Sequence, residues 1–159
     1  MRVLVTGSAD GLGRLAAAGL LEAGHEVVLH VRNDSRLDAV ADLVASGAEV
    51  VFGDLADLAQ TRAVADQANA LGRMDAVIHN AGVYSGSAVL PVNVVAPYLL
   101  TATMERPDRL VYLSSGMHRG GRADIDGVDW SGRRPSRSYS DSKLFLTTLA
   151  AAVARLWPG

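Results

Sequence analysis

The chain has 159 residues, of which 49% are hydrophobic, and its formal net charge is −2. This length fits one domain, residues 1–159, with a substantial core. The composition excludes a disordered chain and gives no basic footprint for nucleic acid. Cysteine is absent, which excludes disulfides and thiol catalysis, and the four histidines lack metal-ligand spacing, so we expect no metal site. No apolar run forms a leader or approaches the ~20 residues of a membrane span, so we expect a cytoplasmic protein.

Five short apolar runs predict strands at residues 2–6, 26–31, 49–52, 75–79 and 109–113. They are apolar throughout rather than alternating, which is typical of parallel strands covered on both faces. Helices are expected at 12–23, from a cap at Asp34 or Ser35 to about Gly47, from a cap at Asp57 to about Gly72, at 92–104 with Pro97 as a candidate kink, and at 138–156. This alternation predicts βαβ units with right-handed crossovers. The long segment 115–137, rich in Gly and Arg, is typical of a functional or mobile loop.

The turn between the first strand and the first helix carries three spaced glycines. Gly7 permits a tight turn, Gly11 lets the backbone approach a pyrophosphate, and Gly13 lets the helix pack closely on the strand. The helix N-terminus would offer unpaired N–H groups and the positive end of its dipole to phosphates. The glycine trio alone fits an ordinary strand–helix turn equally well. Its place after the first strand and before an Ala-rich helix favours a dinucleotide site.

Further short motifs follow in a fixed order. They are Thr6-Gly7-Ser8-Ala9-Asp10-Gly11-Leu12-Gly13, Asp54-Leu55 after the third strand, Asn80-Ala81-Gly82 after the fourth, Asn93, Ser114-Ser115 and Tyr139-x-x-x-Lys143. Over nearly the whole chain this ordered set resembles the compact members of the short-chain dehydrogenase/reductase family. The resemblance implies a three-layer α/β fold, a Rossmann-type doubly wound parallel sheet of about five strands in the order 3-2-1-4-5.

The resemblance also implies an NAD(P)-dependent oxidoreductase that interconverts a carbonyl and an alcohol by hydride transfer. Tyr139 would act as the general acid/base, and Lys143 would hold the nicotinamide ribose. Ser115 would hydrogen-bond the reacting oxygen, and Asn93 would hold a water that relays the proton. The residues expected to bind the cofactor are Gly7, Ser8, Asp10, Gly11, Leu12, Gly13, Arg32, Asp54, Leu55, Asn80, Ala81, Gly82, Tyr139 and Lys143.

The spacing of Tyr139 and Lys143 also has a chemical use of its own. Residues four apart on a helix share a face. A tyrosine with a pKa of about 10 is almost fully protonated at neutral pH, and a nearby cation favours the phenolate. Alone, the pair fits a solvated helix face better than a catalytic site. Together with Ser115 and the glycine turn, it favours catalysis.

The end of the second strand predicts a preference for NADP(H) over NAD(H). An acidic residue there would bond both ribose hydroxyls of NAD, whereas arginine accommodates the extra phosphate of NADP. Arg32 occupies that place, and Arg36 follows it closely in sequence. Asp10 in the glycine turn argues in the other direction, because its charge would repel the phosphate.

The motifs between Ser114 and Leu144 are closest in pattern to the retinol-dehydrogenase-like and protochlorophyllide-reductase-like branch. Two features depart from the family pattern. Gly82 and Asn93 are unusually close together, and the chain ends at Gly159, before the family's sixth strand and substrate-binding loop. We therefore expect an open nicotinamide end and a protein that binds cofactor better than it turns over substrate.

Two other interpretations stay open at this point. One is a catalytically weak dinucleotide-binding or redox-sensing protein, which the short C-terminus favours, and the other is a purely structural α/β domain. The expected partners are a small carbonyl or alcohol substrate and a second copy of the chain, through the fourth and fifth helices. Roles outside any site are expected for His25, His30, His79 and His118, and His79 is interpreted as a sheet residue whose hydrogen bonds are satisfied. A solvated loop, or alternatively a lip that attracts acidic substrate groups, is expected around Arg119, Arg122, Arg133, Arg134 and Arg137.

Overall fold

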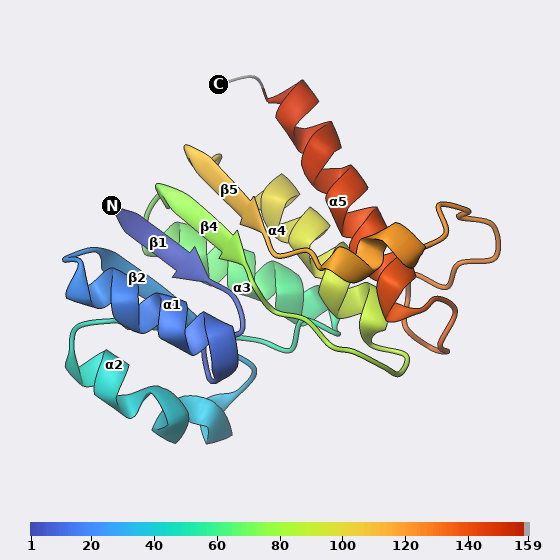
Figure 1. Cartoon of the computed structure of the whole chain (residues 1–159). Coiled ribbons are helices and arrows are strands. Elements are labelled where there is room, and N and C mark those ends of the chain that lie inside the picture. Colours follow the sequence, from blue (N-terminus) through green and yellow to red (C-terminus); the bar gives the residue numbers. More distant parts are fainter. Residues whose placement is uncertain (158–159) are drawn as a thin grey trace.

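A five-stranded parallel sheet organises residues 1–157, which are the residues that the computed structural model describes (Figure 1). Pro158 and Gly159, which the predicted domain includes, lie outside them. The strands pair in the order β3-β2-β1-β4-β5, so the predicted order is confirmed. The predicted bounds agree with the structure to within one residue at each end. The strands are β1 (Arg2–Val5), β2 (Glu26–Val31), β3 (Glu49–Phe52), β4 (Ala76–His79) and β5 (Arg109–Tyr112).

Helical segments connect the strands in the predicted alternation. Asp57 caps the helix that begins at Leu58, as predicted, because its Oδ1 atom accepts a hydrogen bond from the Gln60 amide at 2.8 Å. The predicted cap at Asp34 or Ser35 is wrong. The cap position is Asn33, and the Ser35 hydroxyl donates to the Asn33 side chain at 2.6 Å instead. The segments are α1 (Gly11–Glu22), the 3₁₀-helix η1 (Asp34–Val40), α2 (Ala41–Ala45), α3 (Leu58–Ala70), the π-helix η2 (Pro91–Val95), α4 (Ala96–Thr103), the 3₁₀-helix η3 (Gly116–Gly120) and α5 (Tyr139–Leu156).

The core has two halves, one on each face of the sheet. Alternate strand residues face opposite sides, so Leu4 and Val28 pack with α3 and α4, whereas Val5 and Leu29 pack with Ala17 of α1. Figure 1 shows α1 and α2 on one face and α3 and α4 on the other. These two layers of helices explain why the central strands read as continuous apolar runs.

Strand β5 departs from this pattern. Arg109 and Val111 are exposed, and Val111 keeps 39% of its accessible surface. Helices α1 and α2 lie over β1, β2 and β3, which leaves this face of β5 uncovered within residues 1–157 (Figure 1). The prediction that all five strands are covered on both faces is therefore wrong for β5.

The predicted helix 92–104 consists of two segments, η2 and α4. Pro97 has no N–H, so it cannot donate to the Asn93 carbonyl four residues earlier. The chain instead makes a wider π turn, in which the Ala96 amide donates to the Pro91 carbonyl. The effect of Pro97 is thus a change of helix type just before α4. No helix in the described part of the chain has both the length and the apolar character that a membrane span requires.

Candidate active site

A cavity of about 830 Å³ lies along the carboxyl ends of the strands. In sheets of this kind, ligands bind in the crevice where the strand order reverses, here between β1 and β4. Most of the predicted site residues line this cavity, whereas Ser8, Gly13 and Asn93 do not. The lining residues are Gly7, Ala9–Leu12, His30–Asn33, Arg36, Gly53–Leu55, Asn80–Tyr84, Val92, Leu113–Ser115, Tyr139 and Lys143.

The turn after β1 has the glycine geometry that the sequence predicts. Gly7 and Gly11 have φ angles of 67° and 52°, which side chains rarely tolerate. A Cβ atom on Gly13 would collide with the Gly7 carbonyl oxygen and the Asn80 side chain. Asp10 occupies the N-cap position of α1, but its carboxylate makes no capping hydrogen bond there. The first turn of α1 therefore presents backbone N–H groups toward the cavity without a side-chain cap.

Asn80 holds this turn in place from β4. Its Nδ2 atom donates to the Thr6 and Gly7 carbonyls at 2.9 and 3.2 Å, while the Asn80 and Ala81 amides each donate to Thr6 Oγ1 at 3.0 Å. These bonds fix the glycine turn against the end of β4. The Asn80-Ala81-Gly82 motif thus shapes the cavity as well as lining it.

His30 connects the turns after β1 and β3. Its Nδ1 atom accepts from the Gly7 amide at 3.1 Å, so Nε2 carries the proton and donates to the Gly53 carbonyl at 2.8 Å. Ser8 is buried beside it, and its Oγ accepts from the His30 amide at 3.2 Å. Burial lowers the pKa of His30, which favours this neutral form. His30 was not among the predicted site residues. Its place two residues before Arg32 was the signal that could have indicated one.

Two arginines stand at the β2 end of the cavity, each near a carboxylate. Arg36 Nη2 lies 2.7 Å from Asp10 Oδ2, which joins η1 to the glycine turn. Arg32 Nε lies 3.9 Å from Asp54 Oδ2. Both guanidinium groups are partly exposed, so a phosphate entering this end could contact them.

Tyr139 and Lys143 lie at the opposite end, on the first turns of α5. The Lys143 Nζ atom donates to the Leu113 carbonyl at 2.7 Å and lies 5.5 Å from the centre of the Tyr139 ring. Burial lowers the pKa of Lys143, which is 3% exposed. Lys143 is also the only lysine in the sequence, since every other position counted as Lys or Arg is an arginine. Tyr84, which was not among the predicted site residues, packs against Tyr139 with ring centres 4.9 Å apart and ring planes tilted by 37°.

Ser115 and Ser114 both reach the cavity from the end of β5 but have different partners. The Ser115 Oγ accepts from the Met117 amide at 3.2 Å and so caps η3. The Ser114 Oγ pairs with Thr147 Oγ1 on α5 at 2.7 Å. Of the two hydroxyl groups, that of Ser115 can donate to a bound molecule while it keeps the hydrogen bond that it accepts.

Asn93 is fully buried next to this end of the cavity, although its connection to Gly82 is short. Its Oδ1 atom accepts from the Val83 amide at 2.8 Å, and its Nδ2 atom donates to the Val83 carbonyl and to Ser142 Oγ at 2.9 and 3.0 Å. The side chain therefore joins η2 to α5. The Asn93 main-chain carbonyl lacks the usual helical donor, because the residue four positions later is Pro97, which has no N–H.

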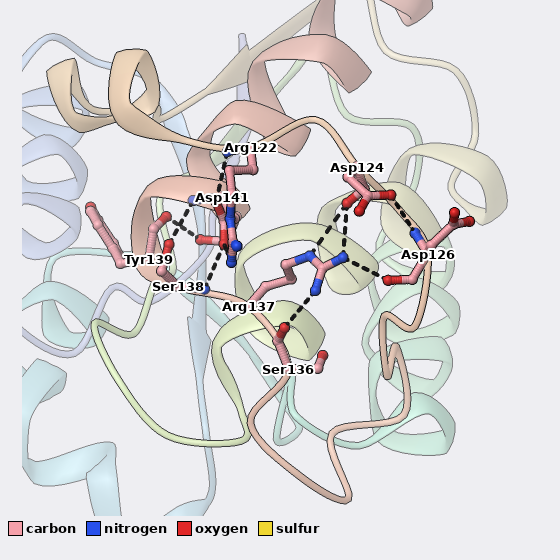
Figure 2. A network of polar contacts seen from close by, with 9 residues as sticks. Arg122, Asp124, Asp126, Ser136, Arg137, Ser138, Tyr139 and Asp141 are labelled. Atoms are coloured by element: carbon pink, nitrogen blue, oxygen red, sulfur yellow. Dashed lines mark hydrogen bonds and ion pairs between the residues drawn. The ribbon is translucent and has the colours of Figure 1, made fainter.

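The helix that carries Tyr139 begins in a network of polar contacts (Figure 2). Ser138 and Asp141 form a reciprocal capping box, and Asp141 also accepts from the Arg122 amide at 2.7 Å. Burial raises the pKa of the Asp141 carboxyl, but the hydrogen bonds from Arg122 and Ser138 outweigh it and hold the pKa below its usual value. Arg137 donates to main-chain carbonyls of its own loop. The Arg137 side chain thus holds the loop itself together, whereas the Arg122 guanidinium is exposed and lies 3.6 Å from Asp141 Oδ2.

His79 lies on β4 outside the cavity and departs from its expected role. Its ring is fully buried and stacks on Tyr112 at 4.8 Å. Nε2 lies 3.3 Å from Thr101 Oγ1, but Nδ1 has no hydrogen-bond partner in the part of the chain that the structure describes. The expectation of a fully satisfied sheet residue is therefore wrong.

The chain matches a family model described as short chain dehydrogenase over residues 1–107. An uncharacterized oxidoreductase of Emericella nidulans is 41% identical over 170 aligned residues, which cover 99% of this chain and 65% of that protein. The short-chain dehydrogenase chyC of Penicillium rubens is 37% identical, with 99% and 67% covered. The chain thus spans about two thirds of the length of these relatives.

Solved structures give the same result. A blue fluorescent protein from a metagenomic library, in complex with NADPH, matches with a TM-score of 0.78 and 25% identity, over 97% of this chain and 67% of that one. A short-chain dehydrogenase of Shigella flexneri complexed with NADP matches with a TM-score of 0.77 and 25% identity, over 99% and 72%. Sequence match, strand order and site geometry agree, and the chain belongs to the short-chain dehydrogenase family.

Proposed function

We propose that this protein is an NAD(P)-dependent oxidoreductase that interconverts a carbonyl and an alcohol by hydride transfer. The observation that carries the proposal is the arrangement of residues along the cavity at the carboxyl ends of the strands. An anion-binding glycine turn lies toward one end, and Tyr139, Lys143 and Ser115 lie toward the other. A dinucleotide laid along it would have its pyrophosphate near the first turn of α1 and its nicotinamide near Tyr139.

The adenosine end supports a preference for NADP(H). Arg32 and Arg36 both line it, and a 2′-phosphate is a strong acceptor for guanidinium groups. Asp54 and Leu55 would lie beside the adenine, and Lys143 would hold the nicotinamide ribose. The structural relatives complexed with NADPH and NADP support the same choice. When bound, the cofactor supplies the hydride, and the protein supplies its binding and orientation.

Tyr139 would give its phenolic proton to the substrate oxygen during reduction and take one from it during oxidation. The Lys143 side chain lies near the Tyr139 ring, where its positive charge would offset the negative charge that this exchange leaves behind. Ser115 would hydrogen-bond the same substrate oxygen and stabilise its developing charge. A water that returns the proton would be bound by the main-chain carbonyl of Asn93, because the Asn93 side chain is used by Val83 and Ser142.

The test is a titration of the protein with NADPH and with NADH, followed by a panel of aldehydes and ketones. We expect binding of NADPH, with weaker binding of NADH, and carbonyl-dependent loss of NADPH absorbance. Binding without turnover on any carbonyl would instead identify a catalytically weak dinucleotide-binding or redox-sensing protein. Failure to bind either cofactor would contradict both functions.

A further inference from the structure

We propose that Asp141 is a positioning residue that fixes Tyr139 relative to Ser115, by tying the segment after Ser115 to the first turn of α5. The proposal rests on the proposed function only in that Ser115 and Tyr139 are the reacting pair. Figure 2 shows the contacts that Asp141 makes with Ser138 and Arg122. Three observations lead to the proposal. The buried Asp141 carboxylate contacts two separate segments, Gly121 packs closely against α5, and the exposed loop 123–137 begins and ends next to these contacts.

Asp141 has more partners than a helix cap needs. It is 2% exposed, and its Oδ2 atom accepts from the Ser138 amide at 3.0 Å while Ser138 Oγ accepts from the Asp141 amide at 3.1 Å. This reciprocal pair satisfies the start of α5 on its own. The second oxygen, Oδ1, accepts from the Arg122 amide at 2.7 Å, and the Arg122 guanidinium lies 3.6 Å from Oδ2. Asp141 therefore makes contacts to a segment outside its own helix turn.

That segment begins at Ser115. Ser115 caps η3, its carbonyl accepts from the His118 amide at 3.0 Å, and the His118 carbonyl accepts from the Gly121 amide at 3.0 Å. Gly121 lies directly on α5, since a Cβ there would be 2.5 Å from the Ser140 carbonyl oxygen and 2.9 Å from Leu144 Cβ. A short hydrogen-bonded path thus runs from Ser115 through η3 to Asp141, two residues after Tyr139.

The contact between Asp141 and Arg122 joins the two ends of a long loop. Residues 123–137 form an exposed excursion, which Arg137 holds together internally by donating to the Asp124, Asp126 and Ser136 carbonyls at 2.8 to 3.3 Å. Helix ends fray readily, and Tyr139 is the first residue of α5. Without a bond at the base of the excursion, its motion would reach Tyr139 directly.

Other contacts hold the later turns of α5 independently of Asp141. Lys143 is anchored on the Leu113 carbonyl, and Ser142 is anchored on Asn93. Loss of the tie should therefore move Tyr139 without disturbing the part of the site that holds the cofactor. Misplacement by about 1 Å can lower a rate by about 10²-fold. The effect should appear in turnover and not in cofactor affinity.

The experiment compares Asp141→Ala with two matched control variants. Ser138→Ala removes the other half of the capping box but leaves the contact between Asp141 and the Arg122 amide. Asp57→Ala removes the N-cap side chain of α3, which is far from Ser115 and Tyr139 in the sequence. We expect Asp141→Ala to lower kcat by about 10²-fold with the Kd for NADPH within twofold, whereas both controls keep kcat within about twofold. Equal kcat in Asp141→Ala and Ser138→Ala would overturn the proposal.

Amide hydrogen exchange tests the tie without any reference to activity. In Asp141→Ala, exchange should accelerate at least tenfold at the Arg122 amide and along Gly116–Gly120, and in Ser138→Ala it should not. The tyrosine ring signals provide a second readout, because the chain has only four tyrosines and Tyr139→Phe assigns the relevant one. Unchanged exchange at Arg122, or an unchanged Tyr139 signal, would overturn the proposal even in a protein with no turnover. If the parent protein shows no turnover but exchange at Arg122 is still faster in Asp141→Ala, only the proposed function is contradicted and the role of Asp141 stands.

Discussion

The Nζ atom of Lys143 donates to the main-chain carbonyl of Leu113 at 2.7 Å, which ties α5 to the end of β5. This contact holds the Lys143 side chain at the wall of the cavity, near the Tyr139 ring. Burial lowers the pKa of Lys143, because it disfavours the charged form of the amine. A function that uses an amine at this place would explain why a lysine is buried here.

Lys143→Met should weaken NADPH binding and turnover together. The substitution removes a charged donor, whose hydrogen bonds contribute about 1.5–3 kcal/mol, so NADPH affinity should fall by about 10- to 100-fold. Because Lys143 is the only lysine, ¹³C-lysine labelling of the parent gives a single signal that reports this side chain. That signal should shift as NADPH saturates the protein. A signal that stays constant through saturation would place Lys143 outside the binding site.

Arg32→Asp should reverse the cofactor preference from NADPH to NADH. The substitution replaces a guanidinium that can contact the 2′-phosphate with a carboxylate that can accept from both ribose hydroxyls. The measurement is the Kd of each cofactor, together with 2′,5′-ADP and 5′-AMP as fragments that isolate this end. Equal affinity of the parent for NADH and NADPH would refute the preference.

Asp10→Asn should strengthen NADPH binding and leave NADH binding unchanged. The Asp10 carboxylate holds Arg36 at 2.7 Å and would compete with a 2′-phosphate for it. The pair is partly exposed, so we expect a gain of about fivefold that shrinks at high salt. Asp42→Asn is the matched control, because it breaks a similar pair, Arg14 to Asp42 at 2.6 Å, with the same charge change away from the cavity. An equal gain in NADPH affinity in both variants would show that the effect comes from the change in net charge and not from Arg36.

His79 should make the protein sensitive to acid. Burial lowers its pKa to about 3 from the usual 6.5, so below pH 6.5 the unfolded chain binds a proton that the folded chain does not. Stability is therefore fully present above pH 6.5 and falls as the pH drops toward 3, by roughly 1.4 kcal/mol per pH unit in the steep part. His30, whose pKa burial also lowers, acts in the same direction.

His79→Asn should flatten this dependence. Urea unfolding at pH 7.5, 6 and 5 gives the free energy of unfolding of the parent and the variant. The loss of free energy between pH 7.5 and 5 should be smaller in His79→Asn than in the parent, and His25→Asn, outside the core, should match the parent. Parallel curves for parent and His79→Asn would show that His79 is not protonated on unfolding in this range.

The strands could be predicted from the sequence because parallel strands in this sheet are apolar on both faces. The runs at β2 and β3 were placed correctly to the residue. The same rule failed at β5, where Val111 is apolar but exposed. An apolar run shows that a strand exists, but whether a helix covers it depends on elements elsewhere in the chain.

The candidate site could be predicted as far as its motifs are local. The glycine turn and the Tyr139–Lys143 pair are short patterns whose geometry follows from the turn and helix that carry them. The contacts of His30 and Tyr84, and that of Asp141 with Arg122, could not be found in that way, because the partners lie many residues away. The bridge from Gly7 to Gly53 through His30 requires three strands to be adjacent, which spacing within one segment does not encode.

The most direct test of the account is Tyr139→Phe, which removes only the hydroxyl that would transfer the proton. The measurement pairs the Kd for NADPH with the turnover of the best carbonyl substrate, for the parent and the variant. We predict a Kd within about twofold of the parent and a turnover lower by about 10²–10⁴-fold, the range for loss of a general acid/base. Parental turnover in Tyr139→Phe would contradict the account, because Tyr139 would then be a residue of the cavity wall without a part in the chemistry.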